Sequence, residues 1–401
     1  MPKPRRVALL IDTSTSWGTR LIKGINLFAQ QARNWLIHVE PRGRYEHLHI
    51  PHGWQGDGVI ARINSPALAE EIAAAGLPAV DVSWYRYEGP RIARCTVDDQ
   101  LTGRMAAEYF LSNGFRQFAY CGPIDRPGYH DGLAEAFSRS LGAAGYACRR
   151  YVQPPADAGP PPWDAHLSSL VEWLQSLPRA TALLAWGATR GRQVTEACHY
   201  AGVPVPDHVA VLGGEYDDLM SNISTPPLST VDQPAEQVGY AAAQLLERMM
   251  AGRKPPAEPV LFPPSRVVVR HSTDTLAVDD PLVREALELI RRKAASGMYV
   301  ADVARALLVA RRTLEQRFIR TIGRTPAAEI RRVRIEEAKR LLIESSCSVA
   351  QVARAAGFAQ QDLFSRTFRR CVGASPSEFR KYHGGVWQTA AAASPLSDGG
   401  S

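Results

Sequence analysis

The chain has 401 residues, of which 45% are hydrophobic and 22% are charged, and it carries a net charge of +7. This length predicts two or three globular domains with cores of their own and excludes a comfortable single-domain interpretation. Six cysteines lie far apart without a Cys-x-x-Cys pair, which argues against a zinc ribbon and a disulfide scaffold and favours buried thiols.

The first apolar run begins at Val7 and ends at Asp12, far short of a signal-peptide core or a membrane span. We therefore expect a cytoplasmic protein. His47, His49 and His52 lie close together and raise the alternative of a metal site. Proline and glycine flank them and no helical i, i+4 pair is present, so we expect neither a metal nor a cofactor.

From Val7 to about Arg270, short apolar runs alternate with amphipathic segments. Strands are expected at 7–11, 35–39, 58–62, 78–82, 118–121, 182–186, 209–213 and within 266–273, and helices at 20–31, 105–113, 133–145 and 193–202. Crossovers of this length imply parallel sheets with helices on both faces, and the number of units favours two doubly wound lobes. Ligands of such folds bind at the carboxyl ends of the strands.

The chain changes character near residue 275. Proline-rich stretches at 251–259 and 263–264 precede the last strand, and the residues after Pro281 have an almost entirely helical pattern up to Tyr382. We expect an α/β body over 1–275, a linker over 276–281, a helical domain over 282–383 and a disordered tail over 384–401.

The positive charge is confined to the C-terminal part. Residues 282–383 contain 21 Lys and Arg against 10 Asp and Glu, so they carry +11 and the remainder carries −4. A basic module beside a mildly acidic body is typical of a protein that meets phosphates at one end. The alternative is a soluble basic surface without a partner.

The C-terminal segment contains an internal repeat. Residues 300–326 match residues 349–376 at an offset of 49 to 50, and the second copy has one extra residue in its turn. Each copy reads as a helix, a tight turn and a second helix with a buried aliphatic or aromatic stripe. Leu308 stands where the second copy has Gly357, so we expect the first turn to be made differently.

The second helix of each copy has polar side chains around this stripe, such as those interleaved with Phe358, Leu363, Phe364 and Phe368. Gln pairs well with adenine and Arg with guanine in the major groove, and Ser and Arg also contact phosphates. The candidate DNA-binding residues are Arg311, Arg312, Glu315, Gln316, Arg320, Gln360, Gln361, Asp362, Ser365, Arg366 and Arg369. A merely solvated amphipathic helix is the alternative for any one copy.

A long helix over 327–345 connects the copies, and its Ile330, Val333, Ala338, Leu341 and Leu342 are expected to pack against both. The repeat resembles the AraC family of transcription regulators, through A-x-x-x-G-F at 353–358, F-x-x-x-F at 364–368 and G-x-S-P-x-E-F-R at 373–380. This resemblance implies two helix-turn-helix DNA-binding units in one chain.

The first 275 residues resemble the effector domains of LacI-type regulators, through stretches such as 56–62, 96–122, 201–218, 224–246 and 266–273. The combined resemblance, which regulators of xylose operons share, implies a two-lobed periplasmic-binding-protein-like (LacI-type) α/β sensor followed by an all-α double helix-turn-helix domain. It further implies a cytoplasmic homodimer, an operator in double-stranded DNA, a small carbohydrate-like effector and contact with RNA polymerase.

Sugar clefts combine an aromatic platform with carboxylates and amides. The candidate ligand-binding residues are Asp12, Thr15, Trp17, Arg20, Trp84, Asp98, Arg190, Glu215 and Asp217. Ala188, Leu133 and Glu215 depart from the pattern of the sugar regulators, which puts xylose itself in doubt and leaves a different ligand or a degenerate pocket open. The chain has none of the Walker, G-x-G-x-x-G, G-x-S-x-G or HExxH motifs, so we expect no enzyme.

Overall fold

The structure is a computed structural model that describes residues 4–43, 46–85, 92–123, 131–152, 163–278 and 280–383. The chain divides into two compact units. The N-terminal unit comprises Met1–Leu111 and Phe115–Thr275, and the C-terminal unit comprises Ser112–Gly114 and Leu276–Ser401. The predicted tail over 384–401 lies outside the described residues.

The first sheet of the N-terminal unit has the strand order β11-β5-β4-β3-β1-β2 and is parallel throughout. Its strands are β1 (Arg5–Leu10), β2 (Trp35–Val39), β3 (Gly58–Ala61), β4 (Ala79–Asp81), β5 (Ala93–Val97) and β11 (Val260–Phe262). The helices with it are α1 (Ser16–Ala32), α2 (Pro66–Ala74) and α8 (Ala235–Met250). Strands such as β3 are continuous apolar runs because helices cover both faces of a parallel sheet.

The second sheet has the order β12-β10-β9-β8-β6-β7 and is parallel except for β12, which pairs antiparallel with β10. Its strands are β6 (Gln117–Cys121), β7 (Cys148–Arg150), β8 (Thr181–Ala185), β9 (Val209–Gly213), β10 (Ser229–Asp232) and β12 (Arg266–Val268). The helices are α3 (Asp99–Ser112), α4 (Gly132–Ala143), α5 (Trp163–Gln175), α6 (Ala188–Tyr200) and α7 (Asp218–Ile223).

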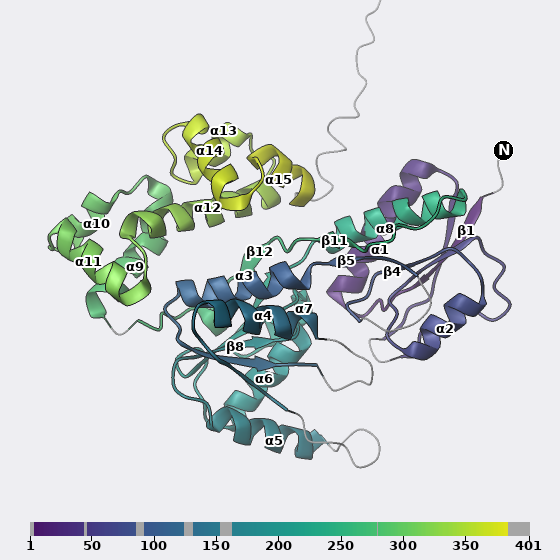
Figure 1. The fold of residues 1–401 in the computed structure, drawn as a ribbon, viewed down its shortest axis with the longest axis horizontal. Coiled ribbons are helices and arrows are strands. Elements are labelled where there is room, and N and C mark those ends of the chain that lie inside the picture. The colour runs from purple at the N-terminus through teal and green to yellow at the C-terminus, as the bar shows by residue number, and fades with distance from the viewer. Residues whose placement is uncertain are drawn as a thin grey trace, which may run out of the picture. The chain divides into compact units, whose positions relative to one another are not determined.

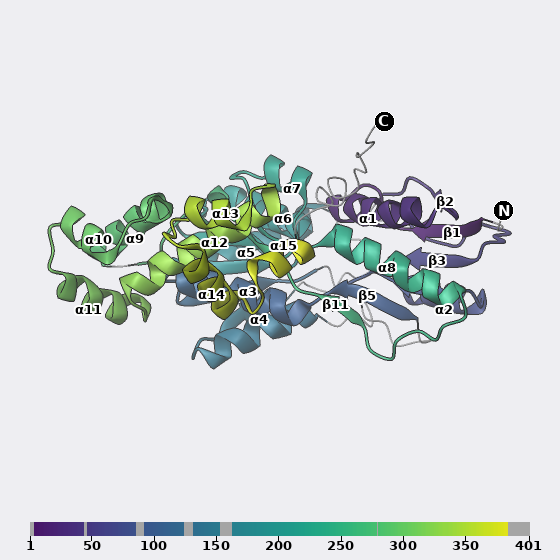
Figure 2. The ribbon, with the colours of Figure 1, turned by 90° about the horizontal axis from the view of Figure 1, so that it is seen from above.

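The chain passes between the two sheets after β5, after β10 and after β11, so each lobe is built from separate parts of the sequence (Figure 1). Helices α1 and α8 lie side by side on the first lobe (Figure 2). Their backbones approach so closely that a Cβ on Gly24 would lie 1.9 Å from the Glu236 carbonyl oxygen and one on Gly239 2.1 Å from that of Leu21. Glycine is required at both positions.

The prediction of two doubly wound lobes is confirmed. The strands β5, β7, β10 and β11 were not predicted, because they are short or carry polar residues, as in the Ser-Thr-Val-Asp of β10. They are strands because their neighbours in the sheet complete their hydrogen bonding, which no local pattern reveals.

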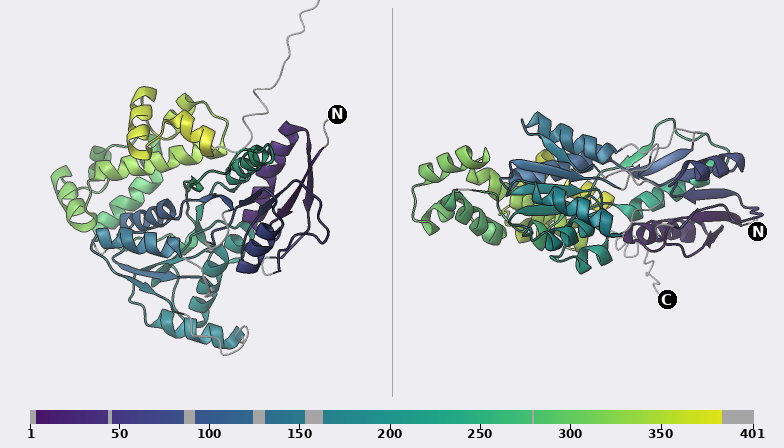
Figure 3. Two further views of the ribbon diagram at one scale, coloured as in Figure 1. Left: turned by 45° about the vertical axis from the view of Figure 1, so that its right-hand side comes forward. Right: turned by 90° about the horizontal axis from the view of Figure 1, so that it is seen from below.

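The described part of the C-terminal unit is helical, with two groups of helices on the long helix α12 (Figures 1 and 3). The helices are α9 (Pro281–Lys293), α10 (Val300–Ala306), α11 (Arg311–Ile322), α12 (Pro326–Glu344), α13 (Val349–Ala355), α14 (Gln361–Val372) and α15 (Pro376–His383). As predicted, α12 serves two cores: Ile330 and Val333 pack with α9 to α11, whereas Ala338, Leu341 and Leu342 pack with α13 to α15.

The cysteines agree only in part with the expectation of buried thiols. Cys95, Cys121 and Cys198 are buried and Cys148 is half-buried, but Cys347 and Cys371 are exposed on the helical unit. Burial raises the pKa of the Cys95 thiol to about 12. No cluster of three or more potential metal ligands occurs among the described residues. No helix in the described ranges is long and apolar enough to span a membrane.

Candidate functional site

The turns of the two helix-turn-helix copies begin in the same way. In the first copy, the Leu308 amide donates to the Arg305 carbonyl at 3.2 Å and the Val309 amide to Ala304 at 3.0 Å. In the second, Gly357 donates to Arg354 at 3.0 Å and Phe358 to Ala353 at 2.9 Å. Leu308 has φ 53° and Gly357 has φ 84°, so both adopt the left-handed conformation. The expectation that Leu308 imposes a different turn was therefore wrong.

Leu308 and Gly357 share a left-handed backbone conformation but differ in the space around them. A Cβ on Gly357 would lie 2.7 Å from the carbonyl oxygen of Ala294 and 2.8 Å from that of Ala295. The Leu308 side chain is 93% exposed. Leucine is tolerated in the first turn because its side chain projects into solvent, whereas the second turn has room only for glycine.

The second helix of each copy, α11 or α14, is held by its apolar stripe. Leu314 and Phe318 in α11, and Phe364 and Phe368 in α14, are fully buried. Phe364 and Phe368 contact each other edge to face with ring centroids 5.5 Å apart. Leu363, which the sequence pattern grouped with this stripe, is instead 49% exposed.

Most of the predicted DNA-binding side chains are exposed on α11 and α14. The exposed ones are Arg311, Arg312, Gln316, Arg320, Gln360, Gln361, Asp362, Arg366 and Arg369, while Glu315 and Ser365 are half-buried. Arg311 is engaged by Glu315, with the two side chains 2.8 Å apart. Sequence reasoning missed Ile319, an apolar side chain that is 53% exposed on α11. Its i+1 spacing from Phe318 is the only local signal that it faces outward.

Two further features fix the ends and the orientation of α11. Gly323, with φ 72°, ends the helix in the left-handed conformation. Arg317 forms a two-pronged ion pair with Asp280, at 2.7 and 2.8 Å, and Asp280 also caps the start of α9. Burial opposes ionisation of Asp280, but the bonds from Arg317 hold the pKa of its carboxyl below the usual value.

In the N-terminal unit, aromatic side chains from both lobes meet near the carboxyl ends of the strands. Trp17, in the first turn of α1, contacts Trp84 with ring centroids 4.6 Å apart, and Trp84 contacts Trp186 at 5.9 Å. The Arg62 guanidinium lies 4.8 Å from the centre of the Trp84 ring. Arg62 also forms a buried ion pair with Asp12.

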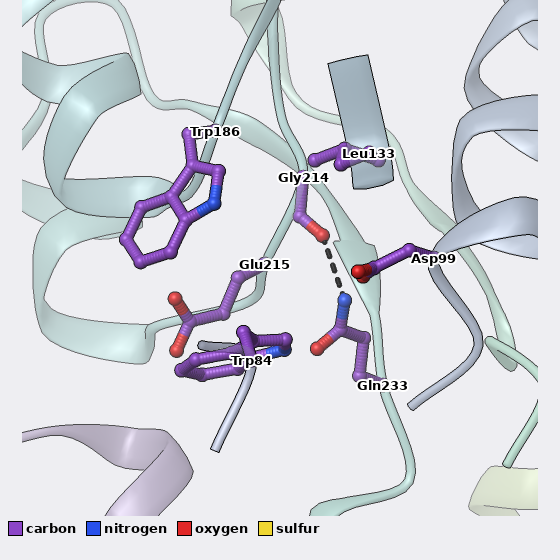
Figure 4. Close-up of a pocket in the computed structure, with 7 residues that line it drawn as sticks. All are labelled: Trp84, Asp99, Leu133, Trp186, Gly214, Glu215 and Gln233. Carbon is purple, nitrogen blue, oxygen red and sulfur yellow. Dashed lines mark hydrogen bonds between the residues drawn. The ribbon is translucent and has the colours of Figure 1, made fainter. Parts of the chain in front are cut away.

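A pocket lies beside these rings (Figure 4). It is lined by Trp84, Asp99, Leu133, Trp186, Gly214, Glu215 and Gln233. The Glu215 carboxylate lies between the rings of Trp84 and Trp186, and Asp99 points toward Gln233 and the Gly214 carbonyl (Figure 4). Gln233 Nε2 donates to the Gly214 carbonyl at 3.0 Å. Gln233 Oε1 is buried and has no hydrogen-bond partner among the described residues.

Of the predicted ligand residues, Trp84 and Glu215 line this pocket. Leu133, named for its departure from the sugar-regulator pattern, lines it too, whereas Ala188 is buried at the start of α6. Asp99, Trp186 and Gln233 were missed. Trp186 directly follows the end of β8, and Asp99 lies two residues after the end of β5. This position just beyond a strand is the sequence signal that could have identified both residues.

The other predicted ligand residues have structural partners. Those that act as helix caps are Thr15 for α1, Asp98 for α3 and Asp217 for α7. Arg190 donates to the Gly122 carbonyl at 2.9 Å, and Arg20 pairs with Asp232 at 2.9 Å. Asp12 accepts a hydrogen bond from Thr15 in addition to its ion pair with Arg62.

Hydrogen bonds between the starts of two helices connect the two lobes directly. The Ser16 amide donates to Asp217 Oδ2 at 2.8 Å, and the Asp218 amide donates to Ser16 Oγ at 2.9 Å. Ser16 begins α1 in the first lobe, and Asp217 and Asp218 belong to the second. The start of α1 and the start of α7 therefore hold the lobes together beside the pocket.

Two family models match the chain in the regions just described. A periplasmic binding protein-like domain matches residues 107–273, and a helix-turn-helix domain matches residues 303–382. Together with the two-lobed fold and the paired exposed helices, these matches define a DNA-binding transcription regulator with a periplasmic-binding-protein-like sensor.

The similarity extends to particular regulators. The xylose operon regulatory protein of Escherichia coli (strain K12) is 29% identical over 384 residues, which cover 94% of this chain and 97% of that protein. A solved structure of the xylose-binding transcription activator xylR has a TM-score of 0.60 at 27% identity and covers 96% of this chain and 99% of its own. A putative AraC-like transcription regulator of Streptomyces antibioticus is 37% identical over 103 residues, 26% of this chain and 34% of that protein. The predicted resemblance of the helix-turn-helix domain to AraC-type regulators is thereby confirmed.

Proposed function

We propose that this chain regulates a sugar-utilisation operon by binding an operator in double-stranded DNA through α11 and α14. The observation that carries the proposal is the repeated surface. Two helices whose preceding turns begin in the same way, and which have the same buried stripe, present arginine and glutamine side chains to solvent, in the basic part of the chain. Such a pair is suited to two major-groove segments of one operator.

The two helices are proposed to read different bases. Gln316 on α11 and Arg366 on α14 occupy equivalent positions at the repeat offset of 50, and both are exposed. An amide pairs in two places with adenine, and a guanidinium does so with guanine. We assign adenine preference to Gln316 and guanine preference to Arg366, while Arg312, Arg320 and Arg369 contribute charge toward phosphates.

A small carbohydrate-like molecule is proposed as the effector. Trp84 and Trp186 offer apolar ring faces, and Asp99, Glu215 and Gln233 Oε1 offer acceptors for hydroxyl groups. A buried unpaired acceptor costs about 1–3 kcal/mol, so a ligand hydroxyl that donates to Gln233 Oε1 would stabilise this arrangement of the lobes. A solved relative that resembles this chain along its length is described as xylose-binding. Because position 133 is a leucine, a pentose would have one polar partner fewer. We therefore propose the class of small carbohydrate-like molecules rather than xylose itself.

We further propose a cytoplasmic homodimer that acts as an activator and contacts RNA polymerase when the effector is bound. Stabilising one arrangement of the lobes would alter how the two protomers of the dimer present α11 and α14 to DNA. This requires only that the ligand bind that arrangement of the lobes better than another. The relatives support the activator role through their described roles as an operon regulator and as a transcription activator.

The proposal is tested by gel shift of the full chain with the DNA upstream of its own gene. A discrete complex is expected that Arg366→Ala weakens and that Arg253→Ala leaves unchanged, since Arg253 is an exposed arginine on the other unit. Addition of pentoses, hexoses and polyols to the same reaction then tests the effector. Equal binding to unrelated DNA at every salt concentration would contradict the proposal.

A further inference from the structure

The two helix-turn-helix copies are joined by more than the helix between them. Arg334, in the middle of α12, is only 9% exposed. Its Nε donates to the Ala294 carbonyl at 2.9 Å, and its Nη2 donates to the Met298 carbonyl at 2.7 Å. Both carbonyls belong to the segment between α9 and α10, at the base of the first copy.

The same arginine also contacts the second copy. Its guanidinium lies 5.8 Å from the centre of the Phe358 ring, in the turn that precedes α14. On the side of the first copy it lies 5.7 Å from the Tyr299 ring. The planar guanidinium can donate from its edge to two carbonyls while its face meets aromatic rings, whereas a lysine ammonium lacks this planar fork of donors.

The backbone of the second turn rests on the segment that Arg334 holds. A Cβ on Gly357 would meet the carbonyl oxygens of Ala294 and Ala295 at 2.7 and 2.8 Å, so these two chain segments are in backbone contact. The Ala294 carbonyl region is thus shared by Arg334 and by the second turn. Burial lowers the pKa of the Arg334 guanidinium.

If the 19-residue helix α12 were the only connection, its bending would change the separation and orientation of the two copies. We propose that Arg334 is a positioning residue that locks the two copies together, so that α11 and α14 keep one separation and the protein reads the spacing of its half-sites as strictly as their sequence. This inference rests on the proposed function of α11 and α14. It assigns no DNA contact to Arg334 itself.

The test measures spacing tolerance with the full-length protein. The probe is a duplex that the wild-type protein selects from a randomised library, together with versions that carry one or two base pairs inserted between the half-sites. One inserted pair moves the second half-site by about 3.4 Å and about 35° around the duplex. For the wild type we expect a loss of about tenfold or more in affinity per insertion, comparable to a mismatched pair.

Arg334→Met is expected to bind the selected duplex more weakly and to lose less than about threefold on insertion, because its two copies can adjust. Arg334→Lys keeps the charge but not the paired bonds, so we expect an intermediate penalty, and this variant decides the question if Arg334→Met does not fold. Arg331→Ala is the matched control, since Arg331 is an exposed arginine on the same helix. It should leave the insertion penalty unchanged even if it lowers overall affinity.

The outcomes distinguish failure of the positioning role of Arg334 from failure of the DNA-binding proposal. If the wild type selects a duplex but folded Arg334 variants show its full insertion penalty, the positioning role is refuted and the DNA-binding proposal stands. If the wild-type protein loses little affinity when base pairs are inserted, the positioning role of Arg334 is also refuted. If the wild type selects no sequence at all, the proposed function fails and the inference fails with it.

Discussion

Exchanging the equivalent residues Gln316 and Arg366 gives the most direct test of base reading. Arg366→Gln should shift the preference at one base pair of the second half-site from guanine to adenine, and Gln316→Arg should make the opposite change in the first. Because the two positions are equivalent in the repeat, each variant installs a residue that the other copy already carries there.

The expected size follows from the surroundings of the two side chains. Both are exposed, and neither forms an ion pair or hydrogen bond with the described residues, so neither exchange removes a native contact. Glutamine and arginine have similar helix propensity, and folding stability should change by less than about 0.5 kcal/mol. A two-pronged contact with the correct base contributes about 1–3 kcal/mol, which corresponds to about 5- to 150-fold in discrimination.

The assay is fluorescence anisotropy at one fixed salt concentration with duplexes that differ only at the chosen base pair. Arg253→Gln, in the N-terminal unit, controls for loss of positive charge. If Arg366→Gln weakens binding to all four duplexes equally, Arg366 contacts phosphate and the assignment of a base to it is wrong. If affinity and preference both stay unchanged, α14 does not enter the groove in the proposed orientation.

The remaining predictions concern stability, pH and ligand binding. Gly357→Ala should destabilise by about 2–5 kcal/mol, from left-handed strain plus the clash at Ala294, whereas Leu308→Gly should be neutral or stabilise by up to about 1 kcal/mol. Thermal melting of both variants checks this, and equal losses would refute the role of space. Burial opposes ionisation of Glu329, but hydrogen bonds and charge from Arg332 and Arg324 hold its pKa below the usual value. Its stabilising contribution is therefore present above pH about 4.5 and lost as the pH falls below that, so the difference in urea midpoint between wild type and Glu329→Gln should shrink between pH 6 and pH 3. A gap that does not change with pH would contradict this. Trp84→Ala should abolish any sugar-induced thermal shift while operator affinity without ligand is retained, and a shift of full size in the variant would exclude the pocket.

The sequence predicted the N-terminal strands best where they are buried on both faces. The apolar run at 209–213 coincides with β9, whose residues are all buried, because a central strand of such a sheet must be apolar along its length. Strand β10, with the sequence Ser-Thr-Val-Asp, lacked that signal. Its place in the sheet depends on β9 and on β12, in which Arg266–Val268 pair with Thr230–Asp232 from further along the chain.

Most of the predicted DNA-binding residues are exposed on α11 and α14, whereas only two of the predicted ligand residues line the pocket. Asp12, Asp98 and Asp217 were predicted as sugar ligands because they are carboxylates near strand ends, but the structure uses Asp98 and Asp217 as helix caps and pairs Asp12 with Arg62. A carboxylate after a strand has the same sequence context whether it caps a helix or faces a pocket. The difference between Asp98 and Asp99 is one residue of helical rotation, which only the packed structure fixes.

By itself the sequence determined the repeat, its charge and the outward placement of the polar residues on α11 and α14, because a helix has a fixed period and a buried stripe fixes its orientation. Only the tertiary structure decided which side chains line the pocket and how the two copies are joined. Arg334, Phe358 and the Ala294 carbonyl are distant in sequence, and their contact arises from packing between helices, which no local pattern encodes.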